Sequence, residues 1–344
     1  RGPIATLRLQ ARDRAEDLLW EPTSVARRIA HLCEHVDPDD VLVDQVSFGS
    51  TLAVYALGRP FVTLVPGHPS QLPVGAERYG VPSHWPEALT PDPGDLARLE
   101  QLVDDVGRRF TDRWNGVLAT LTAHAEPVDD AFRVHGDRVI HNTAPELSPT
   151  AHPRSAEHRF LGPLVRDEAL LNGVASWPRE ADAPLVYVAL GTFLSLRSDV
   201  LERVASALRR VGARAAVATG ATDPCELGPV PSGWIVAPTL PQVALLADAD
   251  LAIHHGGNNS VQESLLAGAR QLVLPFSTDQ FAIAADLERT GRGAVGAPND
   301  ATSDDLAELI EQVLGEPRPD PLPRCDPAEL AAAAQLGAAP AATA

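Results

Sequence analysis

The stretch LAIHHGGNNSVQESLLAG, residues 251–268, places small and polar residues between an apolar run and a helical pattern. Leu251–Ile253 is typical of a buried strand, and Ser260–Ala267 of a helix. The joint therefore follows the carboxyl end of a strand and precedes a helix, where unpaired N–H groups and the helix dipole favour an anion. Glycines allow close approach to a phosphate, and Asn259 or Ser260 can cap the helix.

The residues of this joint alone leave several interpretations open. A tight turn followed by an ordinary helix cap explains them as well as a phosphate site does. The joint is not a Walker loop, because it contains no lysine. His254 and His255 are adjacent at a strand end and point to opposite faces, so they make a poor metal pair. An esterase oxyanion loop is disfavoured because the chain contains no Gly-x-Ser-x-Gly elbow.

Short apolar runs alternate with helical segments through the C-terminal half, which is typical of a parallel sheet covered by helices on both faces. The N-terminal half is less regular, with a Pro-rich loop from Pro66 to Pro93 and a long amphipathic helix from Leu96 that Gly107 and Gly116 could interrupt. The predicted strands are Val41–Val43, Phe61–Val65, Val139–Ile140, Leu185–Leu190, Ala215–Ala218, Trp234–Ala237, Leu251–Ile253 and Gln271–Pro275, and the other predicted helices are Ser24–His35, Ser50–Leu57, Val200–Val211, Ser260–Ala267 and Leu306–Leu314.

Composition excludes some partners. The net charge of −18 argues against nucleic acid and anionic membrane surfaces, which need a basic footprint. No apolar stretch approaches the roughly 20 residues of a membrane span. The three cysteines are far apart and odd in number, so a reducing cytoplasm is the expected location.

A set of polar residues with fixed spacing begins at the joint and continues past its helix: His255, Gly257, Asn259, Ser260, Glu263 and the pair Asp279-Gln280. This set resembles the donor-site signature of the family 1 nucleotide-sugar glycosyltransferases, and HHGGNNS resembles the form found in bacterial antibiotic-pathway members. Leu190-Gly191-Thr192 looks like the family's phosphate loop, and Pro241-Gln242 like its base-binding turn. The resemblance covers about residues 160–315.

The resemblance implies a GT-B fold, an α/β architecture of two Rossmann-like, doubly wound parallel-sheet domains facing a cleft. Residues 162–184 lose periodicity and are charged and proline-bearing, so we expect the domain linker there. With this boundary, the resemblance implies an acceptor-binding domain in residues 1–161, a donor-binding domain in 185–322, and a C-terminal helix and tail in 323–344. It also implies that the donor's diphosphate is bound by His255, Gly256, Gly257, Asn259, Ser260 and Thr192, its ribose and base by Glu263, Gln242 and Leu240, and the transferred sugar by Asp279 and Gln280.

The N-terminal half carries a second match. Asp44, at the end of Val41–Val43, resembles the aspartate that orients the family's catalytic histidine. That histidine lies well upstream in the family, whereas His31 is the first histidine here and falls within a predicted helix. Two explanations are possible: the first strand–helix–strand unit is missing from the sequence, or the protein lacks the usual base. We favour the first explanation, because a domain without that unit would have an unprotected edge strand in its sheet. His68 and Trp85 are weaker candidates for an acceptor pocket.

The implied reaction is the metal-independent, inverting transfer of a deoxysugar from a nucleoside diphosphate, with thymidine favoured, to a hydroxyl group of a natural-product aglycone such as a macrolide or enediyne. The nucleotide sugar is a substrate, and no cofactor or metal is implied. Two alternatives remain: a non-catalytic auxiliary protein that activates a partner transferase, and a nucleotide-sugar epimerase. A homodimer is left open.

Overall fold

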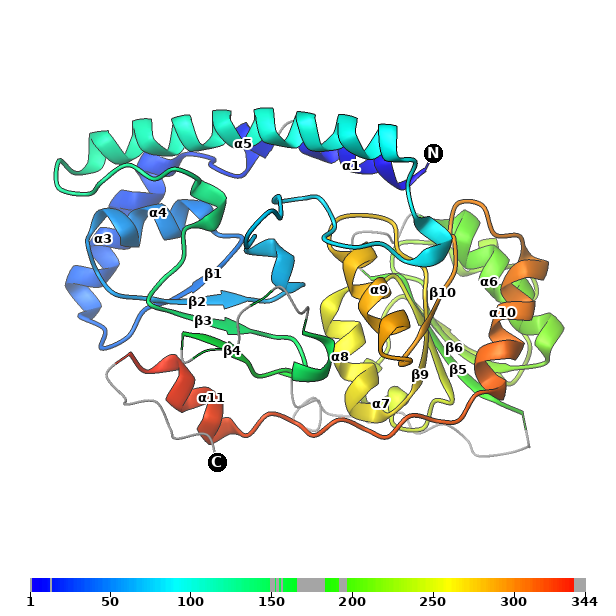
Figure 1. Cartoon of the computed structure of the whole chain (residues 1–344). Helices are drawn as coiled ribbons and strands as arrows, with labels where there is room; N and C mark the ends of the chain where they lie inside the picture. The colour runs from blue at the N-terminus through cyan, green and yellow to red at the C-terminus, as the bar shows by residue number, and fades with distance from the viewer. Residues whose placement is uncertain are drawn as a thin grey trace. The chain divides into compact units, whose positions relative to one another are not determined.

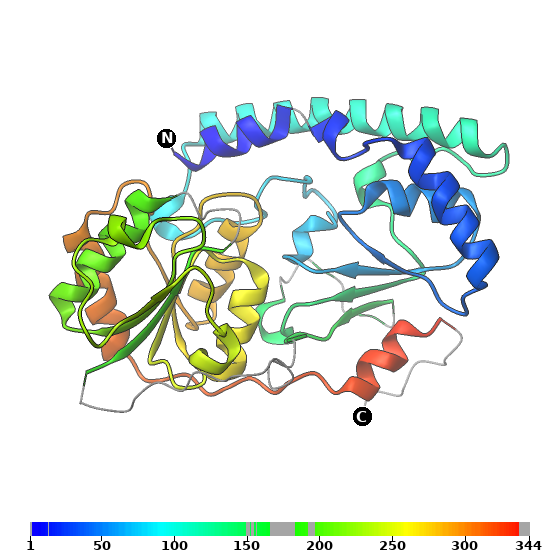
Figure 2. The ribbon, with the colours of Figure 1, turned by 180° about the vertical axis from the view of Figure 1, so that it is seen from behind.

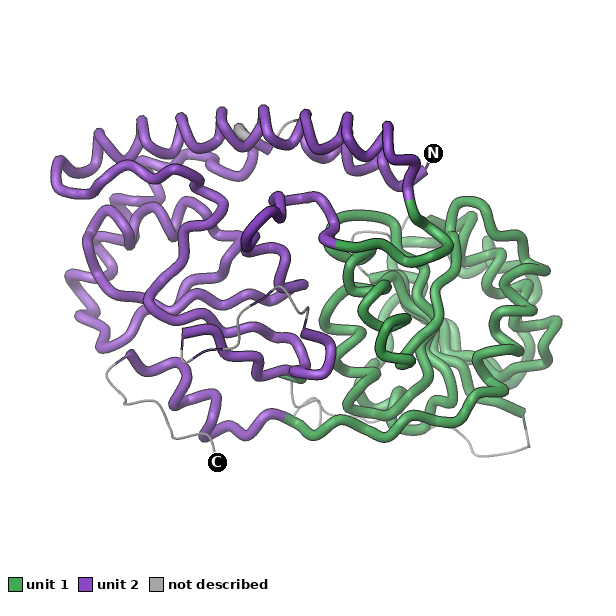
Figure 3. The backbone as a smooth tube through the Cα atoms, in the orientation of Figure 1, with its two compact units in different colours: residues 1, 84–90, 163–324 green, residues 2–83, 91–162, 325–344 purple. Residues whose placement is uncertain are grey.

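A computed structural model of the chain, shown in Figures 1 and 2, describes residues 2–12, 14–148, 152, 155, 157–165, 183–191 and 197–336. The chain divides into two compact units (Figure 3). Unit 1 contains residues 84–90 and 163–324, and unit 2 contains residues 2–83, 91–162 and 325–336. The predicted linker, 162–184, lies mostly outside the described residues.

Unit 1 is built on a wholly parallel sheet with the strand order β10-β9-β8-β5-β6-β7. The order runs outward in both directions from the neighbouring strands β5 and β8, so the topological switch point lies between them. Ligands of such sheets bind beside this point, at the carboxyl ends of the strands. The strands are β5 (Leu185–Ala189), β6 (Arg214–Ala218), β7 (Ile235–Ala237), β8 (Leu251–His254), β9 (Arg270–Val273) and β10 (Ala294–Val295).

Helices cover both faces of this sheet (Figures 1 and 2). Strand β5 is apolar on both faces, as a strand covered by helices on both sides must be. Val186 and Val188 lie in one apolar cluster, and Tyr187 and Ala189 lie in another on the opposite face. The first cluster is completed by α6 and α10, and the second by α7. The helices of the unit are α6 (Ser198–Val211), α7 (Gln242–Leu246), α8 (Asn258–Ala267), α9 (Gln280–Arg289) and α10 (Ser303–Gly315).

Unit 2 contains a second parallel sheet, with the order β1-β2-β3-β4. Its strands are β1 (Leu42–Asp44), β2 (Val62–Val65), β3 (Arg138–His141) and β4 (His158–Phe160), and its helices are α1 (Pro3–Arg12), α2 (Arg14–Asp17), α3 (Pro22–Val36), α4 (Phe48–Ala56), α5 (Pro93–Leu121) and α11 (Pro327–Ala334). The expectation of an α/β protein with two parallel sheets is confirmed. Among the described residues, no helix has the length and apolar character needed to cross a bilayer.

The long helix α5 is continuous, so the predicted interruption is wrong. It begins after Asp92, whose carboxylate accepts from the first-turn N–H groups, and it buries the apolar stripe that includes Phe110 and Trp114. A Cβ at Gly107 or Gly116 would meet no atom within 4 Å, because both glycines lie on the open side of the helix. Packing of the stripe outweighs the low helix propensity of two glycines.

Two strands differ from the sequence-based expectation. Val139–Ile140 is not the last strand of its sheet, because β4 pairs with it in parallel. Strand β10 pairs with β9 and was also missed. Both missed strands are at most three residues long, and His158–Phe160 carries a single apolar residue, so neither shows a recognisable periodicity.

The sheet of unit 2 ends in an unpaired edge at β1 in the described part of the chain. A mostly apolar groove of about 440 Å³ opens beside this edge, between α3, β1 and α4. Leu32, Val36 and Leu42 line it and are well exposed.

Removing the capping box of α10 is expected to lower the free energy of unfolding. The Thr302 hydroxyl accepts from the Asp305 N–H at 3.2 Å, and the Asp305 carboxylate accepts from the Thr302 N–H at 2.8 Å. Thr302→Ala should cost about 1 kcal/mol in urea unfolding. Thr120→Ala, at an exposed helix position without a capping role, should change it by less than about 0.5 kcal/mol; equal effects would contradict the prediction.

Candidate functional site

The joint between β8 and α8 lies at the switch point of the unit 1 sheet. Helix α8 begins at Asn258, and its N-cap in the described structure is Gly257, which has no side chain to cap it. The prediction that Asn259 or Ser260 caps the helix is wrong, because the helix begins two residues earlier than expected. The amide donors of the first turn therefore have no side-chain cap, which suits an anionic ligand.

His254 and His255 have different partners, as expected for neighbours on a strand end. The Nδ1 atom of His254 accepts from the Gly256 N–H at 3.1 Å, so Nε2 carries the proton and donates to Gln271 Oε1 at 2.9 Å. Burial lowers the pKa of His254 to about 3. His254 is thus a neutral residue that ties the end of β8 to β9.

The imidazole of His255 lies between two glycines. A Cβ at Gly191, after β5, would lie 2.5 Å from the ring, and a Cβ at Gly257 would overlap it. Burial lowers the pKa of His255, and the charge of Asp279 and the Ala189 carbonyl oppose this. Among the described residues, the buried Nδ1 atom of the ring has no hydrogen-bond partner. The two glycines therefore confine the ring, and one of its nitrogens is without a partner in the described part of the chain.

Gly256 is required by its backbone conformation. Its φ is +84°, in the left-handed region, and a Cβ there would lie 2.9 Å from the side chain of Val273. Gly256 and Gly257 thus have separate reasons for lacking a side chain: the first is the turn out of β8, and the second is the space occupied by His255.

The predicted ribose-binding residues come together in the structure. The Gln242 Nε2 atom, in the first turn of α7, donates to Glu263 Oε2 and to Ser260 Oγ, the latter at 3.2 Å. Glu263 is buried in α8. A buried carboxylate that retains acceptor capacity beside an amide is suited to bind hydroxyl groups. Leu240 packs against the apolar cluster of this face.

The predicted sugar-binding pair precedes and opens α9. Asp279 lies near His255, as its effect on the pKa of that histidine shows, and its carboxylate accepts from the Thr278 hydroxyl at 3.0 Å. The Gln280 Oε1 atom accepts from the N–H groups of Phe276 and Ser277 at 2.9 and 3.2 Å. Gln280 therefore shapes the loop with its oxygen, and its Nε2 is the atom that can donate to a ligand.

Two predicted diphosphate-binding residues, Asn259 and Thr192, remain. Asn259 is exposed on the first turn of α8, whereas Asn258, which sequence reasoning did not select, is buried and accepts from Gln262 Nε2 at 3.1 Å. Thr192 lies outside the described residues.

Asp44 lies at the carboxyl end of β1, the edge strand of unit 2. Its carboxylate is exposed and accepts from the Val46 N–H at 3.0 Å. The position agrees with the sequence-based expectation of a strand-end aspartate, and its role in orienting a base stays a prediction.

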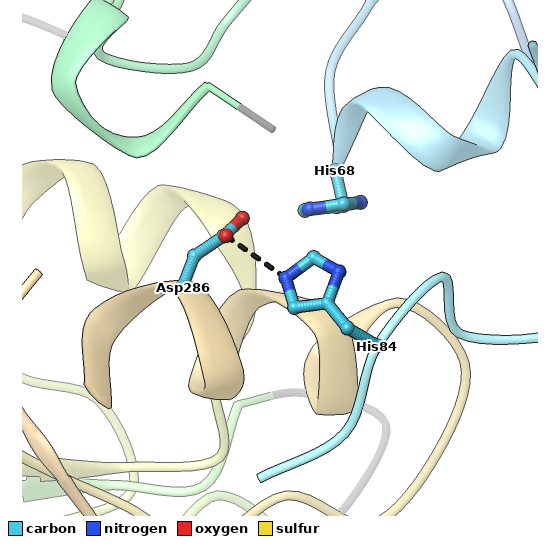
Figure 4. A group of neighbouring side chains, drawn as sticks. All are labelled: His68, His84 and Asp286. Carbon is cyan, nitrogen blue, oxygen red and sulfur yellow. Dashed lines mark hydrogen bonds and ion pairs between the residues drawn. The ribbon is translucent and has the colours of Figure 1, made fainter. Parts of the chain in front are cut away.

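The two weaker candidates from the Pro-rich loop fall in different units. His68 is buried in unit 2, where its Nδ1 accepts from the Ser70 N–H at 3.1 Å. Trp85 belongs to unit 1 and packs on Phe281 of α9, with ring centroids 5.1 Å apart. The neighbouring His84 Nε2 donates to the buried Asp286 carboxylate at 2.9 Å (Figure 4). Ordinary packing accounts for the position of Trp85.

Comparison with known proteins finds relatives that are named as glycosyltransferases. Curated relatives include an "Uncharacterized UDP-glucosyltransferase YojK" of Bacillus subtilis (strain 168), 26% identical over 57% of this chain and 48% of its own length. Another is a "PGL/p-HBAD biosynthesis glycosyltransferase" of Mycobacterium tuberculosis (strain ATCC 25177 / H37Ra), 30% identical over 52% of this chain and 41% of its own length. The chain thus spans about half the length of these relatives, or somewhat less.

Solved structures share the fold. CalG4, the calicheamicin glycosyltransferase, superposes with a TM-score of 0.65 at 21% identity, covering 87% of this chain and 72% of its own. The spinosyn rhamnosyltransferase SpnG, solved with thymidine diphosphate, gives 0.61 at 19% identity, covering 90% of this chain and 74% of its own.

The two parallel-sheet units therefore have the GT-B fold of nucleotide-sugar glycosyltransferases. Residues 202–336, which include the joint after β8, match the family model described as "Erythromycin biosynthesis protein CIII-like, C-terminal domain". The resemblance to natural-product glycosyltransferases stated from the sequence is confirmed.

Proposed function

We propose that this chain is an inverting, metal-independent glycosyltransferase that transfers a deoxysugar from a thymidine diphosphate donor to a hydroxyl group of a natural-product aglycone. One observation carries the proposal: the His255 ring, confined between Gly191 and Gly257, has a buried nitrogen without a partner among the described residues, next to the glycine-capped start of α8. Such a group, with amide donors next to it, suits a diphosphate.

The residues fit the chemistry of an inverting displacement. A base removes the proton of the acceptor hydroxyl, whose oxygen attacks the anomeric carbon as the bond to the diphosphate breaks. Negative charge then develops on the leaving diphosphate, where the first-turn amides of α8 and His255 can stabilise it. By resemblance, Asp44 orients the base.

Metal independence is supported by where the nearby acidic pair lies. Asp248 and Asp250 precede β8, and the Asp250 carboxylate accepts from the Leu185 N–H at 2.9 Å, at the start of β5. This is the amino end of the sheet, opposite the joint, so the pair is not placed to hold a metal-bound diphosphate. Thymidine as the donor base is supported by the thymidine diphosphate complex of SpnG.

Ligand-induced stabilisation tests the donor site. Thymidine diphosphate at ten times its dissociation constant should raise the free energy of unfolding by about 1.4 kcal/mol, and EDTA should not reduce this gain. Adenosine diphosphate serves as the comparison nucleotide and should stabilise less. If neither thymidine nor uridine diphosphate stabilises the protein, the proposal is wrong.

Incubation with a thymidine diphosphate sugar then separates the alternatives. Transfer to an aglycone hydroxyl with inversion supports the proposal. Donor binding without transfer would instead favour an auxiliary protein. Conversion of the nucleotide sugar in the absence of an acceptor would favour an epimerase.

A further inference from the structure

Tyr187, on the central strand β5, reaches the ribose-binding pair from within the sheet. Its hydroxyl donates to Gln242 Oε1 at 3.1 Å. The side chain is 3% exposed and lies in the apolar cluster on this face of the sheet. Its register partners on the two neighbouring strands are Ala216 and Ala252, whose small side chains leave room for a ring. A tyrosine hydroxyl in such surroundings needs a polar partner, and Gln242 supplies one.

The Gln242 amide is held at both of its ends. A carboxamide presents an acceptor oxygen and a donor nitrogen. Glu263 carries a carboxylate that only accepts, so Nε2 faces Glu263 and Ser260, and the Tyr187 hydroxyl fixes the position of Oε1 by donating to it. The reversed amide would set its oxygen against the carboxylate and its nitrogen against the hydroxyl, which replaces a charge-assisted hydrogen bond by repulsion between two acceptors.

We propose that Tyr187 is a positioning residue for recognition of the donor's ribose. It orients Gln242, and through Gln242 it holds the Glu263 carboxylate where it accepts from a ribose hydroxyl. The inference rests on the proposed function, because it requires a nucleoside diphosphate at this site. The resemblance to known glycosyltransferases selected Gln242 and Glu263 but not Tyr187.

The test compares two ligands that differ in one hydroxyl group: thymidine diphosphate and 2′,3′-dideoxythymidine diphosphate. Tyr187→Phe removes one O–H and retains the ring. Its dissociation constant for thymidine diphosphate should rise about fivefold, the size expected for one neutral hydrogen bond. The variant and the unmodified protein should bind the dideoxy compound with equal affinity, because this ligand lacks the hydroxyl group that would donate to the Glu263 carboxylate.

A matched control and a double variant complete the design. Tyr55 of unit 2 also donates a hydroxyl hydrogen bond, to the Glu126 carbonyl at 3.2 Å, so Tyr55→Phe should leave both affinities unchanged. If the two residues act in one chain of contacts, adding Tyr187→Phe to Gln242→Ala should weaken thymidine diphosphate binding no further.

The outcomes separate this inference from the proposed function. Equal weakening for both ligands, no weakening, additive losses in the double variant, or loss of the fold in Tyr187→Phe would each overturn the role of Tyr187 alone. If the unmodified protein binds neither thymidine nor uridine diphosphate, the proposed function fails first and this inference fails with it.

Discussion

His255→Ala is expected to lower the rate of sugar transfer by about 100-fold or more, the usual cost of removing one preorganised donor to a developing negative charge. The ring is confined between Gly191 and Gly257, so its orientation is fixed before the ligand arrives. A fixed group needs no rearrangement as charge develops on the leaving diphosphate, and its removal is felt mainly in the transition state. Steady-state kinetics with a thymidine diphosphate sugar measures the change.

A second variant tests whether the position of the His255 ring matters, and not only its presence. Gly257→Ala retains the imidazole but places a methyl group where the ring lies, so it should reproduce most of the loss. His124→Ala, at an exposed histidine of unit 2, is the control and should retain full activity. Normal turnover in both His255→Ala and Gly257→Ala would show that the diphosphate does not use this site.

Acid is expected to destabilise unit 1 through His254. Burial holds the pKa of this histidine at about 3 in the folded chain, against 6.5 in the unfolded chain. As the pH falls below 6.5, His254 binds a proton in the unfolded chain but not in the folded chain. The free energy of unfolding that is present above pH 6.5 is therefore lost progressively toward pH 3. Between pH 6.5 and 4.5 the loss from this single group is about 2 kcal/mol.

Urea unfolding at a series of pH values, followed by a probe in unit 1, tests this expectation. His254→Gln cannot titrate in this range, so it should be less stable than the unmodified chain at pH 7 but should lose about 2 kcal/mol less on acidification. Burial also lowers the pKa values of His141 and His158, which destabilises unit 2 in acid and remains in the variant. If the free energy of unfolding falls with pH equally in the two proteins, His254 is not the cause of the acid destabilisation.

Much of unit 1 could be predicted from the sequence because its elements are periodic and local. The apolar run before His254 and the helical spacing after Ser260 were sufficient to place β8 and α8 on either side of the joint. The exact start of α8 was not predictable in this way. Asn258 and Asn259 are poor helix formers, and the helix begins at Asn258 because the chain has already turned at Gly256 and Gly257.

The contacts between distant parts of the sequence could not be predicted. The closeness of Gly191 to His255 depends on β5 and β8 being neighbours, which is a property of the sheet order. The hydrogen bond from Tyr187 to Gln242 likewise needs α7 to pack on the face that Tyr187 occupies. Spacing along the chain showed which polar residues belong together, but not which buried residue orients them.

The place of α11 has a consequence for how the protein is made. Residues 325–336 belong to unit 2, where Arg138 of β3 donates to the carbonyls of Ala332, Ala333 and Gln335 at 2.8–3.0 Å. A ribosome delivers these residues only after all of residues 163–324 have been synthesised. Synthesis of unit 2 therefore begins before that of unit 1 but is completed after it. In a nascent chain stalled before residue 325, unit 1 would be complete, whereas the Arg138 side of β3 in unit 2 would be uncovered.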